Sequence, residues 1–223
     1  FSGHANESRL VFTKAKVWEG LIAKDRGDLE EALRLFDEAD ADDDLVRARI
    51  DFQRGDIAMR LGLLDAALGA LDSAVQLSQR SEALPQERTR YLARRGSLLR
   101  LRGDLAGSVD DFTAAREQLG ADGVVGDEAE FWRAKIDDES SLTALAMGDY
   151  EEATYAITQS LASFRKHARS ENAGSDYRVL RGTLRLAVAY ACRGLALPYR
   201  RPFPALRDNL DSTGVPHTRQ RIV

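Results

Sequence analysis

The chain has 223 residues and a mass of 24.7 kDa, and its 43% apolar and 30% charged residues exclude an intrinsically disordered composition. A net charge of −4 argues against direct nucleic-acid binding through bulk electrostatics, and no apolar run is long enough for a membrane-spanning helix. The single cysteine, Cys192, excludes an internal disulfide and fits a reducing compartment, so we expect a cytoplasmic protein. A start at Phe1 rather than Met, without a signal-peptide pattern, fits a piece excised from a longer chain.

The first predicted element is a helix over 9–26, because apolar residues such as Val17 and Leu21 recur there at helical spacing. Gly27 ends this helix, since glycine adopts the left-handed conformation of a helix C-cap without steric cost. Asp28 follows and caps a second helix that carries one apolar face. The sequence therefore predicts two helices joined by a Gly-Asp turn.

The same unit recurs along the chain. We expect further helix pairs at 45–61 with 64–80, at 86–102 with 105–119, and at 127–147 with 150–169. A last helix over about 177–194 and a short one over about 204–211 form a weak fifth pair, before a tail at 213–223. These elements predict one helical repeat domain over 1–212, with repeats at about 9–41, 45–80, 86–119, 127–169 and 177–211.

Four copies of one local pattern mark the turns between paired helices. Each copy has a glycine, usually followed by Asp and then by Leu or Tyr, and the glycines are Gly27, Gly62, Gly103 and Gly148. Small residues stand before and after each glycine, at Gly20, Gly55, Gly96 and Ser141, at Ala32, Ala67, Ser108 and Ala153, and at Ala39, Ala74, Ala115 and Ser160. A large apolar residue stands between the last two sets, at Phe36, Leu71, Phe112 and Ile157. Small side chains let two helices cross at about 8–10 Å, and the large one fills the gap beside the crossing.

This pattern resembles the tetratricopeptide repeat. The resemblance implies an all-α, right-handed superhelical solenoid of antiparallel helix pairs, with about four clear repeats and a degenerate fifth. The chain departs from that family in its glycine spacings of 35, 41 and 45 residues, against the usual ~34, and in its missing closing proline. The family's early aromatic residue is also missing from the matching positions, Lys16, Asp51, Leu92 and Asp137.

Long copies of this kind resemble the arrays of large bacterial regulators. They also resemble arrays in actinobacterial proteins that join such repeats to a caspase-like protease domain. No protease motif lies in this chain. The closer likeness therefore concerns the repeats alone.

In repeat arrays of this type the first helix of each pair lines a concave groove. The second residue of the repeat faces that groove and is basic in all five copies: Lys14, Arg49, Arg90, Lys135 and Arg181. Two explanations stay open. The column is a ladder of cations for an acidic ligand, or it reflects the general preference of exposed helix positions for Lys and Arg.

The other residues predicted to take part in binding are Val17, Phe52, Met59 and Arg100. Phe52 and Met59 would supply apolar contacts, although residues of this kind more often belong to the core. The family's carboxylate clamp for chaperone tails also needs an Asn in the groove. The matching positions hold Trp18, Gln53, Arg94 and Glu139, so that clamp is not expected.

Residues for catalysis or metal binding are sparse. The three histidines, His4, His167 and His217, lie far apart without metal-ligand spacing. Cys192 lies in an apolar helix with no adjacent histidine, so we expect a buried structural thiol. No pair of carboxylates stands out for acid–base work. The sequence therefore predicts no enzyme, no cofactor and no metal site.

The sequence favours a non-catalytic protein–protein interaction module, whose groove binds a segment of a protein or peptide. The basic column favours an acidic segment. Two alternatives stay open: a sensor or regulatory region of a larger bacterial regulator or protease, and a structural spacer or self-assembly unit that forms homo-oligomers. Neither nucleic acid nor a membrane is an expected direct partner.

Overall fold

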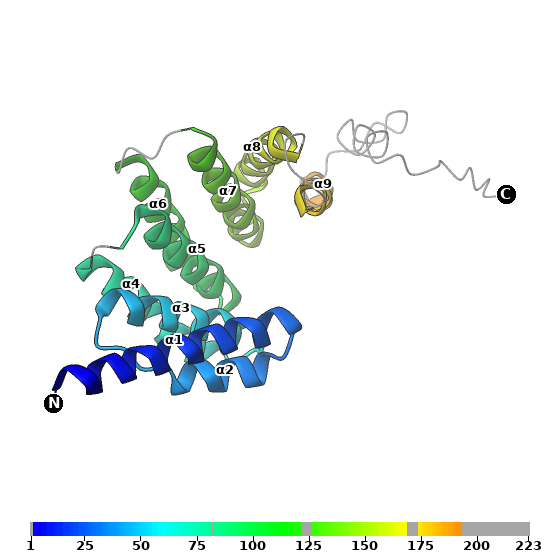
Figure 1. Ribbon diagram of the computed structural model, residues 1–223. Helices are drawn as coiled ribbons and strands as arrows, with labels where there is room; N and C mark the ends of the chain where they lie inside the picture. Colours follow the sequence, from blue (N-terminus) through cyan, green and yellow to red (C-terminus); the bar gives the residue numbers. More distant parts are fainter. Residues whose placement is uncertain (1, 82, 122–125, 169–173, 193–223) are drawn as a thin grey trace. The chain divides into compact units, whose positions relative to one another are not determined.

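The computed structural model describes residues 2–81, 83–121, 126–168 and 174–192, and every regular element in these ranges is a helix (Figure 1). The helices are α1 (Ser2–Arg26), α2 (Leu29–Glu38), α3 (Asp44–Arg60), α4 (Leu64–Arg80), α5 (Pro85–Leu101), α6 (Leu105–Ala121), α7 (Asp127–Met147), α8 (Tyr150–Ala168) and α9 (Gly174–Cys192). The predicted all-α class is confirmed.

The predicted helix ranges agree closely with the structure. The helices α4 and α7 have the predicted bounds, and α3 and α5 are each displaced by one residue. The largest difference is in α1, which begins at Ser2 rather than at residue 9. The predicted short helix at 204–211 and the tail at 213–223 lie outside the described residues.

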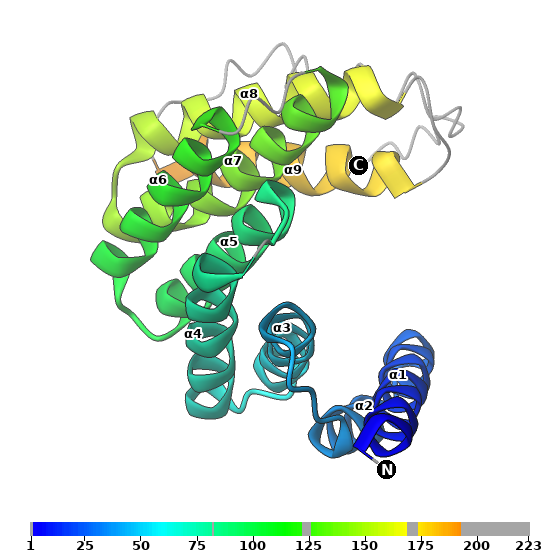
Figure 2. The ribbon, with the colours of Figure 1, turned by 60° about the vertical axis from the view of Figure 1, so that its left-hand side comes forward.

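Contacts divide the chain into two compact units, 1–124 and 125–223. In the first unit, α1 packs on α2, α3 on α4 and α5 on α6, and the pairs are joined by contacts of α2 with α3 and of α4 with α5 (Figure 2). In the second unit, α8 contacts both α7 and α9. Each unit is therefore built from antiparallel neighbours in chain order. The single domain predicted over 1–212 stays a prediction.

The turns between paired helices have the predicted left-handed glycine. The φ angles are 84° at Gly27, 77° at Gly62, 85° at Gly103 and 78° at Gly148. After each of these glycines, the next N–H turns back to a carbonyl of the preceding helix; that of Asp28 donates to Ala23 O at 2.9 Å. This hydrogen bond satisfies a carbonyl at the helix end, so a turn of two or three residues reverses the chain.

Helix crossings have the predicted arrangement of small and large residues. A Cβ atom placed on Gly20 would lie 2.9 Å from the Phe36 ring, and one placed on Gly55 would lie 2.6 Å from Leu71 Cγ. The predicted small residues of the second helices are buried, with exposed fractions between 0% and 3%. Close packing at the crossing therefore depends on residues without bulk.

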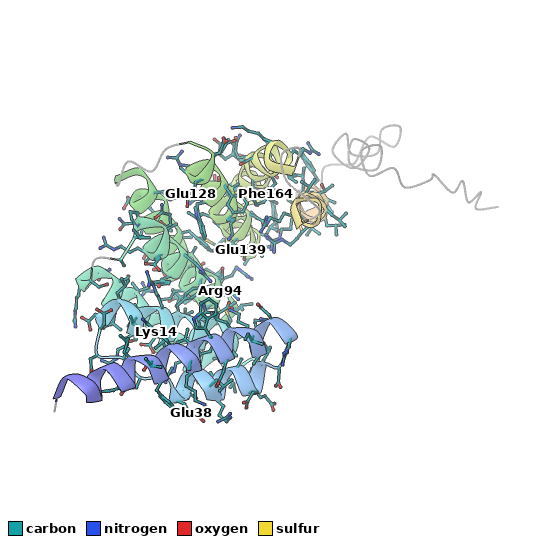
Figure 3. All side chains as sticks on the ribbon, in the orientation of Figure 1. Lys14, Glu38, Arg94, Glu128, Glu139 and Phe164 are labelled. Atoms are coloured by element: carbon teal, nitrogen blue, oxygen red, sulfur yellow. The ribbon has the colours of Figure 1, made fainter. Side chains whose placement is uncertain are left out.

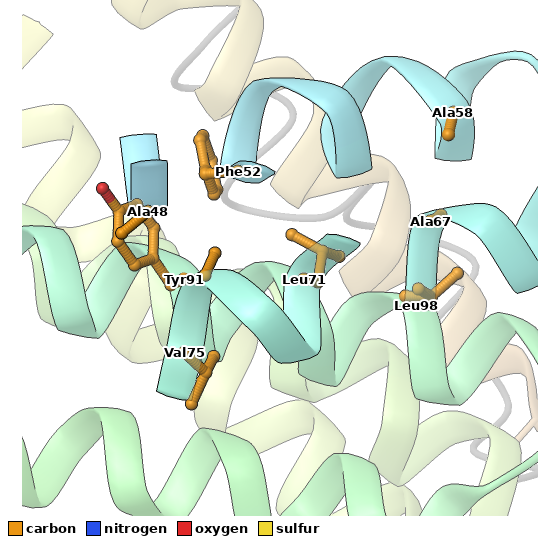
Figure 4. Packing of buried hydrophobic residues seen from close by; sticks show 9 residues of the cluster. Ala48, Phe52, Ala58, Ala67, Leu71, Val75, Tyr91 and Leu98 are labelled. Atoms are coloured by element: carbon orange, nitrogen blue, oxygen red, sulfur yellow. The ribbon is translucent and has the colours of Figure 1, made fainter. Parts of the chain in front are cut away.

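The core of the first unit continues from α3 through α4 to α5 (Figure 4). Leu71 of α4 is fully buried in this cluster, together with Val75 of the same helix. Phe52 of α3 stacks on Tyr91 of α5 with ring centroids 4.9 Å apart. Two consecutive repeats thus share one core, as expected when a single pair cannot bury its own apolar face.

A polar network occupies one position where the family resemblance would place an aromatic residue. Asp51 of α3 is only 7% exposed, and its carboxylate accepts hydrogen bonds from Ser73 at 2.6 Å and from Arg54 at 3.1 Å. Arg54 also forms an ion pair with Asp37 at 3.0 Å. In this copy of the repeat, polar contacts of α3 with α4 and α2 replace the packing of an aromatic side chain.

Candidate binding pocket

A pocket of about 340 Å³ lies in the first unit among residues of α1, α3 and α5, with one residue of α2. This volume falls within the usual range for ligand pockets. Helix α1 contributes Val17 and Trp18, and the Trp18 side chain is 66% exposed. The pocket therefore combines the first helices of three consecutive pairs, which is where the sequence placed the groove.

The floor of the pocket is apolar and buried. Ile50 and Phe52 of α3 line it with Tyr91 of α5, and all three are 2–3% exposed. Burial raises the pKa of Tyr91 to about 12, and nearby Glu87 acts in the same direction, so this phenol stays neutral at physiological pH. An apolar side chain of a ligand would find packed aromatic and aliphatic atoms here.

The rim of the pocket carries three members of the predicted basic column. Lys14 is exposed on α1, where Figure 3 labels it. The Arg90 guanidinium lies over the Phe52 ring, 4.3 Å from the centroid, as in a cation–π contact. Arg49 Nε donates to Glu87 Oε1 at 2.7 Å. Among the residues that line the pocket, Glu87 is the one carboxylate against these three cations.

The other two members of the column lie in the second unit. Lys135 Nζ lies 4.2 Å from the Trp132 ring centroid and 5.5 Å from that of Phe131. Arg181 forms an ion pair with the fully buried Asp138. The column therefore divides into a part that lines the pocket and a part that contacts its own unit.

Two of the remaining predicted binding residues, Met59 and Arg100, do not line the pocket. Met59 is partly buried and packs against the core shared by α3, α4 and α5. Arg100 lies near the end of α5 and is half-buried. Phe52, by contrast, is part of this core and also lines the pocket. The binding role of all these residues stays a prediction.

An ion cluster joins the same three helices beside the pocket. Asp56 of α3 is 9% exposed and forms ion pairs with Lys24 of α1 at 2.6 Å and with Arg94 of α5, labelled in Figure 3. Lys24 also donates to Gln53 at 2.7 Å. Burial favours the neutral acid, but attraction to Arg94 and Lys24 outweighs it and lowers the pKa of Asp56. We call Asp56, Lys24 and Arg94 the Asp56 cluster.

Sequence reasoning missed two features of the pocket. Glu87 was not singled out, although its place in the first turn after Pro85 indicates a capping role. Tyr91, which directly follows Arg90 of the basic column, was also not singled out. Its contact with Phe52 depends on how two consecutive repeats are aligned. The Asp56 cluster was hidden for a similar reason, because its members come from three different repeat positions.

One prediction about side-chain burial is wrong. Cys192, expected to be a buried thiol, is exposed at the last residue of α9. His4 and His167 lie on α1 and α8, and His217 lies outside the described residues. Among the described residues, no three His, Cys, Asp or Glu side chains gather where they could hold a metal ion. None of the described helices has the length and apolar content that crossing a bilayer requires.

No protein-family model matches the sequence, and no curated protein sequence matches it significantly. Solved structures match the fold. One is a putative kinesin light chain from Podosopora anserina with nearly identical TPR-like repeats, with a TM-score of 0.69 at 16% identity over 91% of this chain and 97% of that chain. The apo form of RapI matches with a TM-score of 0.63 at 13% identity over 83% of this chain. MamA matches with a TM-score of 0.57 at 16% identity over 95% of this chain and 98% of that chain.

The chain has a tetratricopeptide-like repeat fold. The match covers 50% of the RapI chain, so this chain spans about half of that protein's length. At identities of 13–16%, these likenesses establish the fold alone. Within that tetratricopeptide-like fold, the pocket lies among the first helices of successive repeats.

Proposed function

We propose that the first unit is a protein-interaction module and that its pocket among α1, α3 and α5 binds an acidic segment of a partner protein. The observation that carries this proposal is the composition of the pocket. A floor of buried aromatic and aliphatic residues lies beside three cations and one carboxylate. A ligand with both an apolar side chain and carboxylates would complement both parts.

The two parts of the pocket would contribute differently to binding. An apolar side chain packed near Phe52 and Tyr91 would lose contact with water, which supplies affinity. Carboxylates near Lys14 and Arg90 would orient the segment and raise its association rate. Binding should therefore weaken with added salt without being lost, because salt screens the charges and leaves the apolar contact.

The test uses a fluorescein-labelled peptide with a central Leu flanked by Asp and Glu, and measures its affinity by fluorescence anisotropy. The Lys14→Gln/Arg90→Gln variant removes two cations from the pocket. We expect it to bind the peptide at least about tenfold more weakly, a difference of about 1.4 kcal/mol. Circular dichroism would verify that the variant keeps its helical content.

A matched control removes the same charge elsewhere. Arg60 and Arg80 are exposed at the ends of α3 and α4 and do not line the pocket. The Arg60→Gln/Arg80→Gln variant should bind the peptide as the unaltered protein does. Equal losses in both variants would indicate bulk electrostatics, and no loss in the pocket variant would refute the proposal.

A further inference from the structure

Arg49 and Glu87 form the one ion pair in which both partners line the pocket. Arg49 Nε lies 2.7 Å from Glu87 Oε1, and Arg49 Nη2 lies 3.3 Å from Glu87 Oε2. Both carboxylate oxygens therefore accept hydrogen bonds from the guanidinium. The Arg49 side chain is 50% exposed and that of Glu87 is 22% exposed. The Glu87 carboxylate accordingly raises the pKa of Arg49 and keeps it charged. An arginine of the predicted column is thus already occupied by a carboxylate of the chain itself.

Glu87 has a second contact that does not involve Arg49. The Leu84 backbone N–H donates to Glu87 Oε2 at 3.3 Å, which caps the first turn of α5 ahead of Pro85. The position of Glu87 is therefore set by its own helix. If Arg49 turned toward another anion, the cap would still hold the Glu87 side chain in place.

We propose that Glu87 is an internal competitor that occupies the place of a ligand carboxylate on Arg49. This inference rests on the proposed function of the same pocket and specifies what it selects. A ligand must bring a carboxylate close to its apolar side chain to take Arg49 from Glu87. A ligand with amides in place of its acids brings no negative charge to Arg49, so it competes poorly with the Glu87 carboxylate for the guanidinium.

The exchange costs little free energy because the pair is partly in water. The Arg49 side chain is half exposed, and ion pairs of side chains in contact with water contribute little to stability, so Arg49 loses little when it leaves Glu87. Lys14 and Arg90 add positive charge beside Arg49, which favours a second carboxylate near the first. Glu87 would thus reduce the affinity for weak anions and leave strongly acidic segments able to bind.

The test replaces Glu87 with glutamine. The Glu87→Gln variant keeps a side-chain oxygen for the Leu84 N–H, as Gln does in capping boxes, and loses the charge that competes for Arg49. The probe is the labelled peptide with Leu flanked by Asp and Glu, beside an isosteric peptide with Asn and Gln in those places. We expect the variant to bind the acidic peptide about fivefold more tightly than the unaltered protein does, with no comparable gain for the amide peptide.

Two further variants separate local competition from a general change in charge. Glu117 is exposed on α6 and does not line the pocket, so Glu117→Gln should leave the affinity unchanged. In an Arg49→Gln background, Glu87→Gln should give no gain, because the residue that both carboxylates bind is gone. A gain that persists in that background would overturn the inference.

The two proposals can fail separately. If the unaltered protein prefers the acidic peptide but Glu87→Gln does not bind it more tightly, internal competition is wrong and the binding pocket stands. If the acidic peptide binds neither protein, or binds no better than the amide peptide, the proposed function is wrong and the inference falls with it. Thermal melting of each variant verifies that α5 remains capped.

Discussion

At the crossing of α3 and α4, the absence of a single methyl group determines how close the helices come. A Cβ atom on Gly55 would lie 2.6 Å from Leu71 Cγ and 3.3 Å from the Ala67 carbonyl oxygen. Leu71 is fully buried, and the carbonyl belongs to a helix backbone, so neither can move aside cheaply. Glycine at this position is therefore a packing requirement rather than a conformational one.

We expect Gly55→Ala to lower the free energy of unfolding by about 1–3 kcal/mol, because the added methyl group overpacks the crossing. Urea unfolding followed by circular dichroism measures the difference. Gly69→Ala is the matched control, since a Cβ atom on Gly69 in α4 meets nothing within 4 Å. That variant should gain roughly 0.5–1 kcal/mol from helix propensity, and a similar loss in both variants would contradict the packing argument.

The Asp56 cluster makes stability depend on pH with a definite sign. The pKa of Asp56 is lower in the folded protein than its ordinary value of 3.8, so the folded state favours the carboxylate. Its contribution is therefore complete above that ordinary value and disappears as the pH falls through the lower, folded pKa.

We expect Asp56→Asn to cost roughly 3 kcal/mol at neutral pH, because it leaves Lys24 and Arg94 without their shared carboxylate. The difference from the unaltered protein should shrink as the pH falls below the ordinary value of 3.8 and towards the lower, folded pKa, where the Asp56 carboxylate takes up a proton. Urea unfolding at several pH values between neutrality and pH 3 measures this difference. A difference that stays constant with pH would show that Asp56 acts by packing and not by charge.

At the scale of helices, the four turns differ in their caps. Aspartate accepts the N–H three residues later at the start of α2, α6 and α8, with distances of 3.4 Å at Asp28, 2.9 Å at Asp104 and 3.0 Å at Asp149. Leu63 holds the same position before α4 and makes no side-chain cap. Its side chain is 49% exposed, so it also contributes little to the core.

We therefore expect Leu63→Asp to stabilise the protein by about 0.5–1 kcal/mol, because it adds a cap and a negative charge at a helix N-terminus. The reverse change, Asp104→Ala before α6, should cost about 1 kcal/mol. Differential scanning calorimetry of both variants would measure these shifts in melting temperature. A lower melting temperature for Leu63→Asp would show that Leu63 has a packing role that its exposure does not indicate.

Across the whole molecule, the helical fold could be predicted because its determinants are local. A glycine with positive φ ends a helix wherever it stands, as at Gly27 and Gly148, and this needs no knowledge of distant residues. The crossing residues recur at fixed distances from those glycines, so Phe36 and Phe112 could be placed in the core from spacing alone. A regular spacing in the sequence is enough to predict such a fold, because each repeat is one structural unit.

The pocket could be predicted only in part, because side chains from different helices decide its chemistry. The column placed Lys14, Arg49 and Arg90 on one surface, and they do line one pocket. Nothing in the column indicated that Glu87 would pair with Arg49, 38 positions earlier. The pairing depends on how far α5 is displaced along α3, which local spacing does not determine. The two alternative functions, a self-assembly unit and a sensor region, stay predictions.

The Gly-Asp turns also bear on how the chain folds. Only two residues separate α1 from α2, so the helices that pack on one another are neighbours in sequence. Closing such short loops costs little entropy, and chains dominated by local contacts fold quickly. Folding of an array can begin in any pair and spread to the next. A substitution that slows formation of the α3–α4 pair should therefore leave other pairs available as starting points, so that the folding rate changes less than the stability.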